Sequence, residues 1–245
     1  MNAGTRKGAL FYMTGKSHPR IAIAPTGLPA GAYDFACRRC ARLAAFVDAV
    51  HAEHPAYFCR PVPPFGEADA RLVIVGLAPG MHGANATGRP FTGDYAGILL
   101  YRTLYDFGFA THPESLGAGD DLRLVGARIT NAVKCLPPGN KPLPAEIREC
   151  NAYLAAELSA VPDGAAILAL GRIAHDAVLR ALGVPVRGRA FGHGARHALE
   201  RGVWLFDCYH CSRYNTNTRR LTPAMFTRVF RAIARHLEQS GAPAA

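Results

Sequence analysis

The sequence predicts an α/β protein whose parallel sheet carries helices on both faces. Short apolar segments alternate with segments whose apolar residues recur at helical spacing, and this alternation is typical of a parallel sheet. A long polar loop after the first apolar segment fits the same architecture, because such loops build ligand pockets at the carboxyl edge of a sheet. Strands are expected at 72–75, 128–133, 165–170 and 203–206, and helices at 41–54, 98–109, 144–158, 174–182 and 223–237.

Each of these elements has a local reason in the sequence. The first two helices place apolar residues on one face: Leu43, Phe46, Val47 and Val50, then Leu100, Leu104 and Phe107. Residues 72–75 are aliphatic throughout, as expected of a strand buried on both faces. Pro144 begins the third helix, where a first turn tolerates proline. Gly171 turns the third strand into the helix that follows it.

Length and composition limit the class of protein. The 245 residues fit one large α/β domain, with a flexible N-terminal arm at about residues 1–30 and a flexible tail at about residues 239–245. A membrane span is not expected, because no run of about 18 apolar residues occurs. An export signal is not expected either, because no long apolar segment follows the N-terminus. We therefore expect a cytoplasmic monomer.

The chain is strongly basic, with a formal net charge of +10. The excess is in arginine, whose planar guanidinium binds phosphate through two donors at once. Six arginines gather toward the C-terminus: Arg213, Arg219, Arg220, Arg228, Arg231 and Arg235. A merely solvated surface can carry such a charge, but phosphate-bearing polymers are the favoured class of partner.

Three unusual features fall at the ends of expected strands. The polar loop at 76–94 follows the first strand, Asn131 ends the second, and His210 follows the fourth. Ordered loops longer than about 12–15 residues are uncommon unless they serve a function. Because the carboxyl ends of parallel strands meet at one edge, the three features indicate a single pocket.

Seven cysteines without an expected export signal favour metal binding over disulfides. The candidate ligands are Cys37, Cys40, Cys135 and Cys150. A chelating pair and two distant thiolates can hold a zinc ion or a 4Fe–4S cluster, and their spacing leaves both possible. Cys59 and Cys208 are expected to be small buried side chains.

These features together resemble the uracil-DNA glycosylase superfamily, and in particular its type B (family 5) members. The matching segments are 76–80, 87–94, 130–133 and 209–218, and their order and spacing are more specific than any one of them. The resemblance implies a three-layer α/β/α sandwich with a short, mostly parallel sheet. It also implies excision of deaminated bases from double- and single-stranded DNA, and a 4Fe–4S cluster on the four cysteines.

The resemblance assigns three roles in the pocket. Phe91 would stack on the flipped base; the alternative, a core position for the ring, is less favoured. Asn131 would read the edge of uracil, because a side-chain amide both donates and accepts, although it could instead cap a turn. His210 would donate to uracil O2 as negative charge develops on the departing base, whereas a lone histidine near a strand end is otherwise structural.

The turn of the first motif lacks an acidic residue. Many members of the superfamily carry Asp, Asn or Glu there to orient the attacking water, but residues 76–80 hold none, and the type B branch shares this lack. Ala78 and Gly80 are expected to line the base pocket. Water would then be held by another polar residue of the loop, with Asn85 and Asp94 as candidates. Asp94 is equally suited to cap the following helix.

The segment after His210 takes the place of the DNA-penetrating loop of the family. Arg213 and Tyr214 would fill the gap left by the flipped base, and Ser212 and Asn215 would bind phosphates. Arg89 of the first motif is also assigned to DNA. The cluster is expected to tie its segments together rather than to do redox work.

Two alternatives are weighed against this function. A type A (family 4) enzyme usually carries Glu in the first turn, and Leu77 and Ala78 argue against it. A non-catalytic nucleic-acid-binding protein with zinc or an Fe–S cluster is disfavoured, because Phe91, Asn131 and His210 occur together. A dinucleotide enzyme is excluded because no GxGxxG follows the first strand. The range of bases excised, such as hypoxanthine and xanthine besides uracil, is left open.

Overall fold

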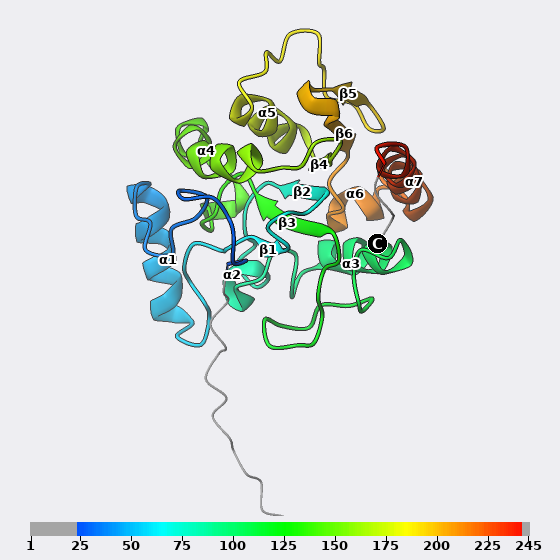
Figure 1. Cartoon of the computed structure of the whole chain (residues 1–245). Coiled ribbons are helices and arrows are strands. Elements are labelled where there is room, and N and C mark those ends of the chain that lie inside the picture. The colour runs from blue at the N-terminus through cyan, green and yellow to red at the C-terminus, as the bar shows by residue number, and fades with distance from the viewer. Residues whose placement is uncertain (1–23, 242–245) are drawn as a thin grey trace, which may run out of the picture.

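A computed structural model describes residues 24–241 (Figure 1), so most of the expected N-terminal arm and the end of the expected tail lie outside the described residues. The helices of this part are α1 (Ala41–Glu53), α2 (Ala84–Thr87), α3 (Tyr95–Asp106), α4 (Pro144–Ser159), α5 (Arg172–Ala181), α6 (Arg213–Asn217) and α7 (Pro223–Gln239). The strands are β1 (Phe65–Gly66), β2 (Leu72–Gly76), β3 (Ala127–Asn131), β4 (Ala166–Leu170), β5 (Arg196–Ala198) and β6 (Trp204–Cys208). No helix in this range has the length and apolar character to cross a membrane.

The six strands form one sheet in the order β1-β3-β2-β4-β6-β5. The four central strands are parallel, and the short β1 and β5 pair antiparallel at the two edges. In this register Gly76 lies opposite Asn131, and Leu170 lies opposite Cys208. The carboxyl ends of the parallel strands therefore meet at one edge, and the prediction of a mostly parallel sheet is confirmed.

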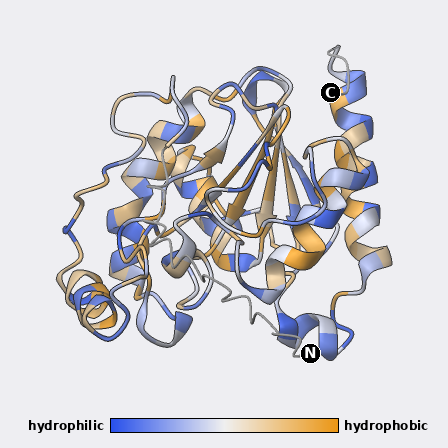
Figure 2. Cartoon of the chain, turned by 90° about the horizontal axis from the view of Figure 1, so that it is seen from below, coloured by the Kyte–Doolittle hydropathy of each residue, from blue (hydrophilic) through white to orange (hydrophobic). Residues whose placement is uncertain are grey.

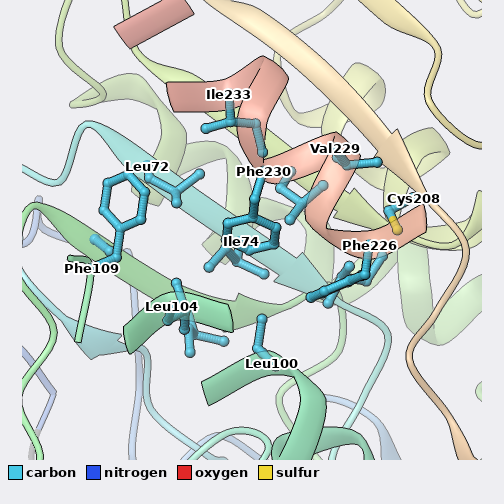
Figure 3. Close-up of a cluster of buried hydrophobic side chains, with 14 of the residues drawn as sticks. Leu72, Ile74, Leu100, Leu104, Phe109, Cys208, Phe226, Val229, Phe230 and Ile233 are labelled. Carbon is cyan, nitrogen blue, oxygen red and sulfur yellow. The ribbon is translucent and has the colours of Figure 1, made fainter. Parts of the chain in front are cut away.

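Helices cover both faces of the sheet, with α3 and α7 on one face and α4 and α5 on the other (Figure 1). Leu72 and Ile74 of β2 pack against Leu100 of α3 and Phe230 of α7 (Figure 3). The alternate residue Val73 packs in the cluster on the other face. Apolar strands occupy the centre of the molecule (Figure 2). Burial of each such side chain contributes about 1.5–3 kcal/mol, so these two clusters stabilise the predicted three-layer arrangement.

The structure departs from the expected elements in three places. The loop at 76–94 contains α2, a single helical turn too short to show a helical apolar period. The edge strands β1 and β5 are two and three residues long, which is too short for a period of two to be read from the sequence. Helix α3 begins at Tyr95, earlier than predicted, because Asp94 caps it, and it ends at Asp106.

A buried charge cluster lies at the end of β3. Arg128, Lys134 and Glu157 are all buried. The carboxylate of Glu157 binds the Lys134 ammonium and accepts a hydrogen bond of 3.0 Å from the Thr130 hydroxyl. Lys134 also donates to the Asn131 carbonyl at 3.0 Å. The cluster therefore fixes the backbone of Asn131 at the carboxyl edge of the sheet.

The variant Glu157→Gln keeps the size of the side chain but leaves two buried cations without a carboxylate. We expect the free energy of unfolding in urea to fall by about 3–5 kcal/mol, because breaking a buried ion pair leaves an uncompensated charge. The control is Glu149→Gln, at an exposed pair 3.7 Å from Arg39, which should change stability by less than about 1 kcal/mol. Equal losses in the two variants would contradict this role for the buried cluster.

Candidate active site

The carboxyl ends of β2, β3 and β6 surround a pocket with an empty volume of about 910 Å³. An open α/β sheet binds its ligand at this edge. Eight residues assigned to the site from the sequence line this pocket: Ala78, Gly80, Phe91, Asp94, Asn131, His210, Ser212 and Arg213. Segments more than a hundred residues apart in the chain therefore contribute to one cavity.

Gly76 allows two pocket side chains to approach the end of the central strand. A Cβ atom at Gly76 would lie 2.4 Å from Asn131 Oδ1 and 2.8 Å from Phe91 Cζ, which is closer than real side chains come. Asn131 is only 4% exposed, and its side chain has no hydrogen-bond partner within the described part of the chain. Because a buried amide without partners is unfavourable, this side chain is suited to a ligand that supplies a donor and an acceptor.

Phe91 forms a wall of the pocket beside His210. The two ring centroids lie 5.7 Å apart, and the ring planes differ by 26°. The backbone of Phe91 has a φ of 54°, which is uncommon for a bulky residue. The Tyr101 hydroxyl holds this turn by donating to the Pro90 carbonyl at 2.7 Å. Gly97 leaves room for the Phe91 carbonyl, which a Cβ there would approach to 1.9 Å.

His210 is held as a neutral imidazole. Burial lowers its pKa to about 4, so the ring carries no charge at neutral pH. The Asn215 side chain donates to the His210 carbonyl at 2.8 Å, and the Ser212 hydroxyl caps α6 by accepting from the Asn215 amide at 3.4 Å. The side chains of Ser212 and Asn215, which the sequence assigned to phosphates, thus bind within the chain and hold His210 in place.

Asp94 both caps α3 and lines the pocket. One carboxylate oxygen accepts from the Gly97 amide at 3.1 Å, and the other oxygen lies against Gly83, where a Cβ would be 2.7 Å from it. Burial raises the pKa of Asp94. The capping role and a role in the pocket therefore do not exclude each other.

The structure does not bring Asn85 to the pocket. Its side chain is fully buried, its Nδ2 lies 3.4 Å from the Cys59 sulfur, and its Oδ1 has no hydrogen-bond partner in the described chain. The expectation that Asn85 holds the attacking water is corrected accordingly. The sequence could not reveal this, because α2 turns the side chain inward.

Arg89 is also placed differently from the sequence prediction. It is 5% exposed, and its guanidinium pairs with Asp120 at 2.5 Å and donates to the Ser115 hydroxyl at 2.9 Å. The guanidinium carbon lies 4.4 Å from the ring centroid of Phe65. In this structure the side chain fastens the first motif to the segment 115–120, and its assignment to DNA stays a prediction.

The rim of the pocket includes Tyr95 and Asn140, which the sequence analysis did not assign to the site. Arg213, at the start of α6, lies 5.2 Å from the ring centroid of Tyr95 at the start of α3, and both line the pocket. Asn140 also lines the pocket, and it lies in a turn where its φ is 57°. The signal for Asn140 is the Pro-Pro-Gly-Asn turn after a strand end, whereas nothing in the sequence marks Tyr95. Tyr214, beside Arg213, is 71% exposed.

Cys37, Cys40, Cys135 and Cys150 line a second cavity, between α1 and α4, with an empty volume of about 430 Å³. Burial first, and then the three neighbouring thiols, raise the pKa of Cys135 to about 12. The backbone amide of Lys134 donates to the Cys150 sulfur at 3.3 Å. Hydrogen bonds to sulfur are among the features that tune Fe–S clusters.

The spacing of the four cysteine sulfurs can be compared with the spacing that a single zinc ion requires. Four sulfurs bound to one zinc ion lie about 3.8 Å apart, since the Zn–S distance is about 2.3 Å. In the described residues, His175, His197 and Asp207 are the one group that brings three ligand atoms within 4.8 Å of one another, so no three of the four cysteine sulfurs lie that close together. Tyr153 also lines this cavity, with its buried hydroxyl beside Cys37. In this structure the sulfurs are therefore spaced more widely than four ligands on a single zinc ion.

Comparison with known proteins agrees with this geometry. The family model described as the uracil DNA glycosylase superfamily matches residues 63–234. A type-5 uracil-DNA glycosylase of Thermus thermophilus is 48% identical over 199 residues, which cover 79% of this chain and 90% of that protein. A type-5 enzyme of Mycobacterium tuberculosis is 45% identical over 204 residues, covering 80% and 76%.

Type-4 relatives match less of the chain. The type-4 uracil-DNA glycosylase of Archaeoglobus fulgidus is 38% identical over 114 residues, which cover 46% of this chain and 49% of that protein. The turn at 76–80, which lacks an acid, agrees with this difference. The chain therefore belongs to the uracil-DNA glycosylase superfamily and, within it, to the type-5 branch.

Proposed function

We propose that this protein repairs DNA by flipping a deaminated base, with uracil as the principal one, into the pocket and hydrolysing its N-glycosidic bond, which leaves an abasic site. The observation that carries this proposal is the convergence of Phe91, Asn131 and His210 on one pocket. The type-5 relatives are named for the same activity. We further propose that the protein is a cytoplasmic monomer.

Base recognition follows from the shape and polarity of the pocket. The flipped base stacks on the Phe91 ring, which contributes about 1–3 kcal/mol per base in nucleic-acid complexes. The Asn131 amide accepts from uracil N3–H and donates to O4. Arg213 and Tyr214 stand at the rim, where they fill the space that the base leaves in the duplex.

Bond cleavage leaves the electron pair of the C1′–N1 bond on the departing base. The neutral imidazole of His210 donates an N–H to O2, where this negative charge develops. Water adds to C1′, and the Asp94 carboxylate accepts its proton. Burial raises the pKa of Asp94, which makes it a better base than an exposed carboxylate.

We infer that Cys37, Cys40, Cys135 and Cys150 would hold a 4Fe–4S cluster. Such a cluster is capable of one-electron transfer when bound, but excision requires none. The four residues instead tie α1 to α4 and to the turn that carries Asn140 to the rim of the pocket. The four residues would thus hold these DNA-facing segments in fixed positions relative to one another.

The direct test is an excision assay on duplex DNA that contains one uracil, followed by alkali. Strand cleavage at the uracil is the expected result, and an intact strand would contradict the proposal. Duplexes with hypoxanthine or xanthine extend the test to other deaminated bases. We propose that these bases are also accepted, since no carboxylate stands in the first turn of the pocket.

Replacing His210 by Ala should lower the single-turnover excision rate by about 10²–10³-fold, because a donor to the developing charge is lost. In the unchanged protein, His210 remains neutral until the pH approaches its pKa of about 4. The rate should therefore show no inflection due to this imidazole between about pH 5.5 and 8. A histidine-dependent inflection near the ordinary pKa would contradict the assignment.

The variant Asp94→Asn separates the two roles of Asp94, because Asn is also a good helix N-cap. We expect the thermal stability to be retained and the single-turnover rate to fall by about 10²-fold, since the amide does not accept a proton from water. A rate equal to that of the unchanged protein would contradict the role of Asp94 as proton acceptor and leave it only the capping role.

Replacing Cys135 by Ser should remove the brown colour and lower the iron content below about four atoms per chain, since one thiolate ligand is lost. The control is Cys208→Ser, because Cys208 of β6 is buried in the cluster under α3 and α7 and does not line the four-cysteine cavity. Visible absorption and iron analysis are measured on both variants. An unchanged spectrum in Cys135→Ser would contradict the cluster assignment.

A further inference from the structure

A basic groove lies outside the pocket, between α7 and the segment that leads into β5, and has an empty volume of about 850 Å³. Its charged residues are Arg196, Arg228 and Arg235, with His193 beside them, and it is lined by neither Asp nor Glu. None of the three arginines forms an ion pair within the described residues. They belong in part to the C-terminal run of arginines in the sequence, which the pocket uses only at Arg213.

The arginines of this groove lie along it with no acidic side chain among its lining residues. Arg228 and Arg235 are exposed and stand two helical turns apart on one side of α7. His193 lies close enough that burial first, and then the Arg228 charge, lower its pKa. Neighbouring like charges repel and oppose folding, and a bound anion removes that repulsion.

The wall of the groove is anchored by a buried carboxylate. Asp207 of β6 accepts from the Gly192 amide at 3.2 Å, and its carbonyl accepts from the Gly194 amide at 2.9 Å. The carboxylate also contacts His175 Nδ1 at 2.7 Å and His197 Nε2 at 3.1 Å. These contacts hold the segment that carries His193 and leads into Arg196, so the groove is a built feature of the fold rather than a free loop.

Tyr209 connects the groove to His210 of the pocket. The ring of Tyr209, which directly precedes His210, stacks on His193 with centroids 5.1 Å apart and planes 21° apart. The guanidinium of Arg220 lies 4.6 Å from the centroid of the same Tyr209 ring. A row of cationic and aromatic groups therefore leads from the residue next to His210 toward Arg228.

We propose that this groove binds the phosphodiester backbone of the DNA outside the flipped nucleotide. The inference rests on the proposed function, because the DNA is the substrate whose base enters the pocket. Each DNA strand presents a phosphate every ~3.4 Å along the helix axis, and arginine forks are suited to these oxygens. Contacts of this kind position the duplex and add affinity but carry no base selectivity.

The test is the salt dependence of binding to a uracil-containing duplex of about 30 base pairs, with the variant Arg228→Gln/Arg235→Gln. Two lost phosphate contacts should reduce the slope of log K against log salt by about 1.8 and weaken binding several-fold. The single-turnover rate at saturating DNA should be unchanged, because neither arginine lines the pocket. Gln is a good helix former, so α7 is retained.

The matched control is Arg123→Gln/Arg180→Gln, which removes two exposed arginines that do not line the groove. Binding by this control should keep the slope of the unchanged protein. Equal slopes and affinities in the two double variants would overturn the inference, even where the unchanged protein excises uracil. Failure of the unchanged protein to excise uracil would instead overturn the proposed function, which keeps the two failures distinguishable.

Discussion

At Gly76 the end of the central strand lies against both Asn131 and Phe91, and a methyl group there would come within 2.4 Å of one and 2.8 Å of the other. Both side chains line the pocket, and in the proposed function they form its stacking face and its polar edge. Because β2 and β3 are in fixed register, the backbone of Asn131 stays in place, so a methyl group at Gly76 would force the Asn131 side chain to rotate. The geometry of the pocket therefore depends on the lack of a side chain at one position.

The first motif is held around that position by contacts behind the pocket and by Asp94 at the pocket wall. Arg89 is buried against Asp120 and Phe65, and Asp94 closes the first turn of α3. Lys134 binds the Asn131 carbonyl from the other side of the strand end. Such pre-organisation allows the site to act on a flipped base without rearranging its own side chains.

The central strands and long helices could be predicted from the sequence, because aliphatic runs and helical periods such as Leu43, Val47 and Val50 depend on burial alone. The pocket could be placed at the strand ends for the same reason. The direction of individual polar side chains could not be predicted. Asn85 and Arg89 lie in the same polar loop as Asp94, yet both side chains turn inward. Asn85 does so because it lies in α2, and Arg89 because it pairs with Asp120, which is far along the chain. Tyr95 and Asn140 reach the rim only through the packing of their segments.

The variant Gly76→Ala shows whether the pocket depends on the missing side chain at the end of the central strand. The backbone of Gly76 is not in the left-handed region, so alanine adds only the methyl group. With far-ultraviolet circular dichroism and visible absorption used to check that the fold and the cluster are retained, excision of uracil from duplex DNA is measured at saturating enzyme. A folded Gly76→Ala protein is expected to lose most of its single-turnover activity in uracil excision. A folded variant that excises uracil at the rate of the unchanged protein would contradict it.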